Sequence, residues 1–204
     1  MTLAEEIIDV LQPKDAPISK TYAKHSTIYD FLNASKQFFG GKNIFMAPSV
    51  RIFDVDMIPF LGTKMLVIRS EAKGLAPNHS ETSEHHVQII RFMGVHFSEG
   101  PQDGYLEASS KRMGQKFWFK PVWQKVNPCD VYCSCKDFQF RFSYYIDSRF
   151  HALATTLTNE IKNYKRKTPP PPKGRPYVNP GHLPGMCKHL LRLTDTLIDN
   201  KVLR

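Results

Sequence analysis

The sequence VYCSCKDFQF, residues 131–140, contains two of the four cysteines in a chain of 204 residues. These two, Cys133 and Cys135, are separated by one residue, Ser134. Side chains at positions i and i+2 of a β-strand project from the same face. If this stretch is a strand, both sulfur atoms point toward one position and the serine points away. The spacing therefore predicts a site for a soft metal ion that thiolates can hold.

A second pair of candidate ligands lies about fifty residues later, where GMCKHLL contains Cys187 and His189. Two residues that are two positions apart inside a helix face nearly opposite ways. Both can bind one ion only if Cys187 lies in the turn before the helix and His189 lies in its first turn. The positive end of the helix would also favour a Cys187 thiolate.

The four residues Cys133, Cys135, Cys187 and His189 form the donor set of a closed structural zinc site. Such a site has no open position for a substrate or for catalytic water. The ion would close a long loop and tie the last helix to the sheet, so metal affinity would add to folding stability.

Cys129 leaves a second interpretation open, because it has the same strand parity as the other two cysteines of its segment. Four thiolates are the usual ligands of an iron–sulfur cluster, and Cys129, Cys133, Cys135 and Cys187 would supply them. Two further alternatives need no metal. The cysteines are then either buried, reduced core residues or a redox pair formed by Cys133 and Cys135.

The rest of the chain predicts an α+β fold with a small, mostly antiparallel β core. Apolar spacing indicates helices over residues 3–11 and 28–39, with Ser26 or Thr27 capping the second. Short stretches rich in β-branched and aromatic residues predict strands within residues 43–55, 63–70, 85–97 and 115–123. The segments between them, residues 73–86 and 98–114, have turn composition.

After the cysteine pair, the alternation of Phe138, Phe140, Phe142, Tyr144 and Ile146 predicts a strand or an extended arm packed on one face. An amphipathic helix is expected to follow through residues 149–164. Residues 165–185 then contain a run of prolines that predicts an extended arm. The last helix is expected to carry a stripe of Met186, Leu190, Leu193 and Leu197.

These patterns divide the chain into a helical N-terminal arm (1–42), a β-rich core with the cysteine strand (43–166), and a Pro-rich arm with the C-terminal helix (167–204). The length suits one domain with appended arms. No stretch has the length and apolarity of a membrane span or of a secretory signal, so we expect a reducing cytoplasm and no membrane contact.

The chain is basic, with 28 Lys and Arg against 19 Asp and Glu and a net charge of +9. This excess suits contact with nucleic acid, an anionic surface or an acidic protein, or it is a solvated surface. The candidates for partner or nucleic-acid contact are the cations of the Pro-rich arm: Lys165, Arg166, Lys167, Lys173 and Arg175.

Three smaller features have both a functional and a structural interpretation. The aromatic segment around Trp118 and Trp123, with Lys116 and Lys120, suits base stacking or an assembly interface. The pair at residues 85–86 is two histidines that suit metal binding or an ordinary junction between loop and strand. Asp137 can orient a ligand or pair with an arginine. No nucleotide-binding loop or nucleophile motif is present in the sequence, which predicts a protein that is not an enzyme.

The spacing CSC followed later by CKH resembles the SWIM-type zinc finger at all four ligand positions, although the two halves are further apart than usual. The wider text VYCSCKDFQFRF and NPGHLPGMCKHLLRL is similar to a group of small structural proteins of tailed bacteriophages. The shared blocks span residues 131–193, about a third of the chain.

The phage resemblance implies a virion component of the tail, baseplate or neck, assembled in the host cytoplasm with other virion proteins, as part of a symmetric oligomer. The SWIM resemblance implies the alternative, a zinc module that binds nucleic acid.

Overall fold

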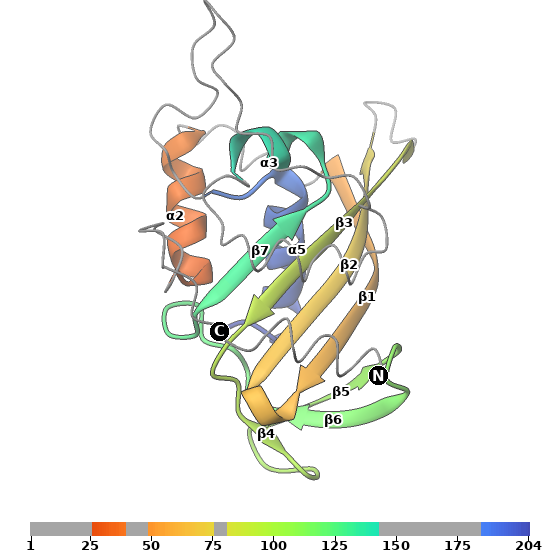
Figure 1. Ribbon diagram of the computed structural model, residues 1–204, viewed down its shortest axis with the longest axis vertical. Helices are drawn as coiled ribbons and strands as arrows, with labels where there is room; N and C mark the ends of the chain where they lie inside the picture. The colour runs from red at the N-terminus through yellow and green to blue at the C-terminus, as the bar shows by residue number, and fades with distance from the viewer. Residues whose placement is uncertain (1–25, 40–48, 76–80, 143–184) are drawn as a thin grey trace, which may run out of the picture.

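The computed structural model describes residues 26–39, 49–75, 81–142 and 185–204 (Figure 1). These residues form an α+β fold with mostly antiparallel strands, as the sequence predicts. The elements are α2 (Ile28–Phe38), β1 (Val50–Phe60), η3 (Leu61–Thr63), β2 (Met65–Leu75), β3 (Glu81–Phe92), β4 (Phe97–Ser98), β5 (Leu106–Ser110), β6 (Gln115–Phe119), β7 (Cys129–Cys133), α3 (Lys136–Arg141) and α5 (Lys188–Asp199).

The larger sheet has the strand order β1-β2-β3-β7, and every neighbouring pair is antiparallel. A smaller sheet has the order β4-β6-β5 and lies at one end of the larger one (Figure 1). Helix α5 packs against β1, β3 and β7, while α2 runs beside β7. Because α5 crosses the sheet, its first turn lies near the end of β7 where α3 begins (Figure 1).

The core lies between α5 and the larger sheet. Strand pairing places Ile68, Ile90 and Val131 in one row across β2, β3 and β7, and all three are fully buried. Helix α5 contributes its apolar stripe, including Leu193 and Leu197, to the same buried cluster. Burial of these apolar side chains is the main stabilisation that the fold provides, at roughly 25 cal/mol per Å² removed from water.

Helix α2 is capped by Thr27, one of the two residues, Ser26 and Thr27, that the sequence offers for this role. The Thr27 hydroxyl accepts a hydrogen bond from the backbone N–H of Asp30 at 3.3 Å, and the Asp30 carboxylate accepts one from the Thr27 N–H at 2.8 Å. This reciprocal pair is a capping box, which satisfies N–H groups that the first helical turn leaves without a partner. Thr27 also bridges to Pro128, just before β7, so the start of the helix is fixed to the sheet.

The predicted strand after the cysteine pair is wrong. Residues 136–141 form α3, and the side chains of Phe138 and Phe142, four positions apart, are both buried. A spacing of four residues brings two side chains to the same helical face as well as to the same strand face. The aromatic alternation therefore fits both structures, and the helix start at Cys135 decides between them. Tyr144 and Ile146 lie outside the described residues.

The loop expected over residues 98–114 is also partly wrong, since it contains β5. Strand β5 pairs with β6 from Leu106 to Ser110, and only its last residue is buried. The segment expected to link residues 73–86 is largely strand as well, because β2 extends to Leu75 and β3 begins at Glu81. Residues with little apolar content give a weak strand signal, both in an edge strand such as β5 and at the ends of central strands such as β2 and β3.

Several predictions lie outside the described residues. These include the N-terminal helix at residues 3–11, the helix at residues 149–164, the Pro-rich arm and its cations Lys165, Arg166, Lys167, Lys173 and Arg175. The division at residues 42 and 166 stays a prediction. Phe31, Ile68 and Leu193, one from each predicted segment, belong to a single buried cluster. No helix in the described part of the chain is long and apolar enough to cross a membrane.

Candidate metal centre

The first part of the site is the end of β7, where Cys133 is the last strand residue and pairs with Gln88 of β3. Ser134 continues the attachment to β3 beyond the strand. Its N–H donates to the Val87 carbonyl at 2.9 Å, and its hydroxyl accepts from the Val87 N–H at 2.9 Å. These two bonds hold Ser134 against β3 and let the chain turn after it.

Cys135 is then positioned by a helix start rather than by a strand. It is the N-terminal cap of α3, and its Sγ accepts a hydrogen bond from the Phe138 N–H at 3.3 Å. The expectation that one strand carries both sulfurs is therefore corrected. Cys133 belongs to a strand, whereas Cys135 lies at the start of a helix, and both are buried.

The second part of the site is the start of α5, and here the sequence interpretation is confirmed. Cys187 is the N-terminal cap, with extended backbone at φ −74° and ψ 168°, and His189 lies in the first turn. The Cys187 carbonyl accepts from the Leu191 N–H at 3.0 Å, while its thiol forms no capping hydrogen bond. The side chain is thus available to another partner.

The two parts meet in one buried cluster. The ligand atoms of Cys133, Cys135, Cys187 and His189 all lie within 4.8 Å of one another. His189 Nδ1 is 3.8 Å from Cys133 Sγ and 3.9 Å from Cys187 Sγ. A tetrahedral zinc site with bonds of about 2.3 Å to sulfur and 2.0 Å to nitrogen requires sulfur–nitrogen separations of roughly 3.5 Å. A small contraction of the cluster would therefore complete the coordination.

The electrostatics of the three thiols also fit a cation. Burial raises the pKa of Cys133 and of Cys187 well above the ordinary value. The pKa of Cys135 is lowered instead, because its sulfur accepts hydrogen bonds from the other two thiols. Without a cation, the Cys135 thiolate therefore accepts hydrogen bonds from the Cys133 and Cys187 thiols, which keep their protons. A divalent ion would displace the remaining protons and supply the missing positive charge.

One of the two consecutive histidines at residues 85–86 lies beside the cluster. The ring of His86 lies 4.5 Å from the ring of His189, centroid to centroid, with the planes tilted by 48°. The adjacent His85 points elsewhere, with Nδ1 3.5 Å from a carboxylate oxygen of Glu71. The two consecutive histidines therefore have different environments, and neither belongs to the group of four ligands. Sequence alone gave no sign that the His86 ring contacts the ring of His189.

Asp137 lies beside the cluster but bonds to α3 itself. Its carboxylate pairs with the Arg141 guanidinium at 2.9 Å, one helical turn later. Burial raises the pKa of Asp137, while the arginine acts in the opposite direction. Of the two roles that the sequence suggested, pairing with an arginine is the one found.

The segment that leads into α5 is held by contacts that sequence analysis missed. The Met186 N–H donates to the Ser35 hydroxyl of α2 at 2.7 Å, and this hydroxyl donates to the Phe31 carbonyl at 2.7 Å. Gly185 lies so close to Phe142 that an added Cβ would be 2.7 Å from its ring. No local pattern could reveal a contact between residues 151 positions apart.

Cys129 does not join the cluster. It lies at the opposite end of β7, opposite Phe92, whereas Cys133 lies opposite Gln88. Four strand steps of about 3.3 Å separate the two cysteines by roughly 13 Å. Cys129 is fully buried, and this burial raises the pKa of its thiol. The described residues thus gather three cysteines and one histidine, not the four cysteines of the iron–sulfur alternative.

The aromatic residues of the segment around Trp118 and Trp123 lie in two different environments. Phe117 and Phe119 of β6 are buried and Trp118 is partly buried, whereas Trp123 is 57% exposed. Lys116 pairs with Glu107 at 2.7 Å. A continuous stacking platform is therefore not present, and the described part of this segment offers one exposed indole.

No family model, curated protein or solved structure matches this chain. The assignment of the site therefore rests on its own geometry. Cys133, Cys135, Cys187 and His189 are buried and close enough to bind a metal ion.

Proposed function

We propose that this protein is a non-enzymatic structural protein in which one zinc ion joins the end of β7, the start of α3 and the start of α5. The observation that carries the proposal is the convergence of Cys133, Cys135, Cys187 and His189 within 4.8 Å in a buried position. Three thiolates and one imidazole complete a tetrahedral shell, so no position is left for a substrate. The role of such an ion is to hold distant chain segments together.

Zinc is the metal that we propose, because the donor set is mixed and compact. Sulfur and imidazole donors in a tetrahedral arrangement are typical of structural zinc sites. The four-thiolate iron–sulfur alternative needs Cys129, and this residue lies at the other end of β7. When bound, the ion would supply positive charge to ligands that are otherwise buried beside one another. The chain's own contribution is to place and orient those ligands.

We further propose that the protein is a bacteriophage virion component of the tail, baseplate or neck. The support is the similarity of its CSC and CKH blocks to small structural proteins of tailed phages, together with a closed ligand set that suits a structural role. Its partners would then be other virion proteins, in a symmetric oligomer assembled in the host cytoplasm.

The metal is tested by elemental analysis and visible absorption of the purified full-length chain. We expect one zinc per chain and a colourless protein, whereas an iron–sulfur cluster would absorb in the visible range. Cys135→Ser should lower the bound zinc to below half of the native content. The matched control is Cys129→Ala, which alters a buried cysteine outside the cluster and should keep the metal. Loss of zinc in both variants, or in neither, would contradict the site.

The virion role is tested by co-sedimentation. The chain, expressed with the structural genes of its own phage, should travel with assembled particles in a density gradient. A chain that remains at the top of the gradient as a folded, zinc-loaded monomer would reject the virion role and leave the metal site intact.

A further inference from the structure

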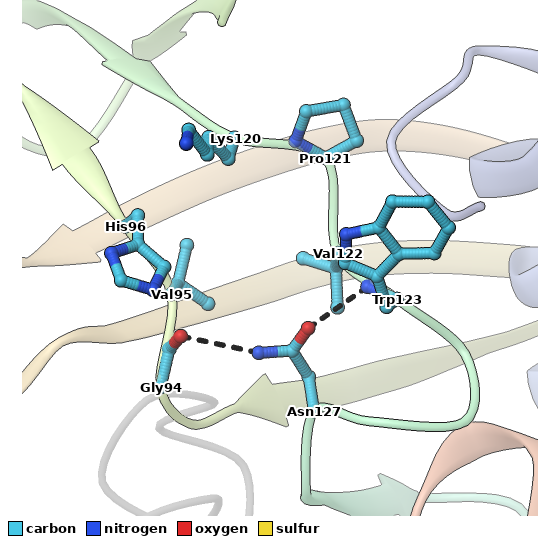
Figure 2. Close-up of a pocket in the computed structure, with 8 residues that line it drawn as sticks. All are labelled: Gly94, Val95, His96, Lys120, Pro121, Val122, Trp123 and Asn127. Atoms are coloured by element: carbon cyan, nitrogen blue, oxygen red, sulfur yellow. Dashed lines mark hydrogen bonds between the residues drawn. The ribbon is translucent and has the colours of Figure 1, made fainter. Parts of the chain in front are cut away.

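An exposed tryptophan, Trp123, lies beside a small cleft, near the end of β7 that is away from the four candidate ligands. Trp123 has 57% of its surface exposed, the largest value of any aromatic residue in the described chain. The cleft has a volume of about 50 Å³. Figure 2 shows two chain segments that form its sides, with His96 on one and Lys120 and Trp123 on the other.

Asn127 joins these two segments and fixes the position of the tryptophan. Its side-chain amide donates to the Gly94 carbonyl at 3.2 Å and to the Met93 carbonyl at 3.0 Å. Its side-chain oxygen accepts from the Trp123 N–H at 2.9 Å (Figure 2). The backbone under the indole is therefore held before any ligand arrives, and preorganisation of this kind lowers the cost of binding.

Three segments lie around the cleft: residues 61–64, 93–98 and 119–127. They contain basic residues and no acidic residue. Backbone hydrogen bonds bring them together: the Val95 N–H donates to the Lys64 carbonyl at 2.8 Å, and the Lys120 N–H donates to the His96 carbonyl at 2.9 Å. The basic residues of these three segments are Lys64, Lys120, Lys125 and His96, of which Lys120 and His96 line the cleft together with Trp123.

These lysines have no acidic partner among the described residues. The ammonium groups of Lys120 and Lys125 instead lie over aromatic rings, at 5.5 Å from the ring centre of Tyr105 and 4.7 Å from that of Tyr29. Asp30, which follows Tyr29 in α2, is engaged by the N–H and hydroxyl of Thr27. By contrast, Lys111 and Lys116 each pair with a carboxylate. The positive charge near Trp123 is thus available to an external anion.

We propose that this surface, formed by Lys64, His96, Lys120, Trp123 and Lys125, binds single-stranded nucleic acid. One base stacks on the exposed indole, and the neighbouring phosphates bind the three lysines. An exposed aromatic ring on a basic surface whose cations have no carboxylate partner is the combination that single-strand binders use. A paired base in a duplex cannot stack on a side chain without leaving its helix, which favours single strands over duplexes.

The proposal does not rest on the metal site. The Trp123 surface lies near Cys129, at the end of β7 away from Cys133, and shares none of the four ligands. It also differs from the nucleic-acid contact expected from the sequence, which used the cations of the Pro-rich arm. A variant on this surface should therefore keep its full zinc content.

Fluorescence anisotropy of a labelled oligothymidylate, with the full-length zinc-loaded chain at about 50 mM salt, tests the proposal. Trp123→Ala should weaken binding by about five- to a hundredfold, the loss of one base stack. Trp123→Phe keeps an aromatic ring and should restore most of the affinity. Unaltered affinity in Trp123→Ala, or no binding by the native chain, would overturn the proposal.

The charge contribution is tested with two matched double variants. Lys120→Gln with Lys125→Gln should flatten the slope of log affinity against log salt by about 1.4, since each phosphate contact on a single strand contributes about 0.7. Lys36→Gln with Lys111→Gln removes the same charge from other surfaces and should leave the slope within about 0.3. Equal losses in both pairs would indicate nonspecific attraction and overturn the site. If Trp123→Ala abolished only attachment to particles, the surface would be a protein interface instead.

Discussion

Helices α2 and α5 begin at buried residues that satisfy the first helical turn in different ways. Thr27 caps α2 through its hydroxyl, and Asp30 completes the box from three residues away. Cys187 begins α5 without any side-chain capping bond, and no acidic residue lies in the first turn. Its thiol instead faces Cys133 and Cys135, which come from a segment more than fifty positions earlier.

The two helix starts are therefore stabilised in different ways, one by local hydrogen bonds and the other by tertiary contacts. The capping box of α2 comes from four consecutive residues, Thr27 to Asp30, and the bridge from Thr27 to Pro128 adds a contact with the sheet. The start of α5 is specified by tertiary contacts: the ligand cluster, the Ser35 hydroxyl on Met186, and the packing of Gly185 on Phe142. We therefore expect α5 to depend on the metal and α2 to depend mainly on its cap.

Removal of the proposed zinc ion should produce the largest effect. Structural zinc contributes on the order of 10 kcal/mol of apparent binding free energy, comparable with the whole stability of a domain. A chelator should therefore lower the melting temperature steeply and should abolish amide protection in α5 before that in α2. Hydrogen exchange followed by mass spectrometry measures both helices in one sample. Equal protection of α5 with and without chelator would remove the proposed dependence.

Acid should have the same effect as the chelator. Thiolate and imidazole ligands must lose their protons to bind the ion, so metal affinity falls as the pH falls. The zinc content after dialysis over a series of pH values should decrease toward acid pH, and α5 protection should decrease with it.

A smaller effect is expected from the packing in front of α5. Gly185→Ala would place a Cβ 2.7 Å from the Phe142 ring, so the ring or the backbone must shift. Overpacking of this kind costs about 1–3 kcal/mol of unfolding free energy, which urea denaturation measures. Gly62→Ala is the matched control, because no atom lies within 4 Å of its added Cβ. If the two substitutions had equal effects, Gly185 would have no special packing role.

The smallest effect should come from the cap of α2. Thr27→Ala removes the hydroxyl that accepts the Asp30 N–H and should cost about 1 kcal/mol of unfolding free energy. Thr27→Ser keeps the hydroxyl and should retain most of this stability. Zinc content should be unaltered in both variants, since the cap shares no ligand with the cluster. A loss of metal in Thr27→Ala would show that the two helix starts are coupled.

Local sequence signals predicted the elements with strong periodicity or a local cap. They placed α2 with its cap at Ser26 or Thr27, the strand-forming regions of β1, β2, β3 and β6, and α5 with its apolar stripe. They missed β5, whose residues are mostly polar, and they assigned α3 to a strand. In α3 the spacing of Phe138 and Phe142 fits either structure, so the choice depends on contacts outside the pattern.

The candidate ligand set was predictable because the cysteines and the histidine occur in two short pairs. The spacing also predicted that Cys187 precedes the helix and that His189 lies in its first turn, as found. It could not separate Cys129 from Cys133, since both have the same parity and both are fully buried. Their different positions along β7 become visible only when β3 and α5 are placed beside that strand.

The sequence by itself determined which side chains can bind a soft metal, the position of the α2 cap to within one residue, and which face of α5 is apolar. These properties depend on residue identity and on spacing within one helix or strand. Only the tertiary structure decided that Cys135 begins a helix, that Cys129 lies apart from the ligands, and that Ser35 holds the entrance to α5. Those outcomes depend on contacts between distant segments, whose free energies arise only when the sheet and α5 pack together.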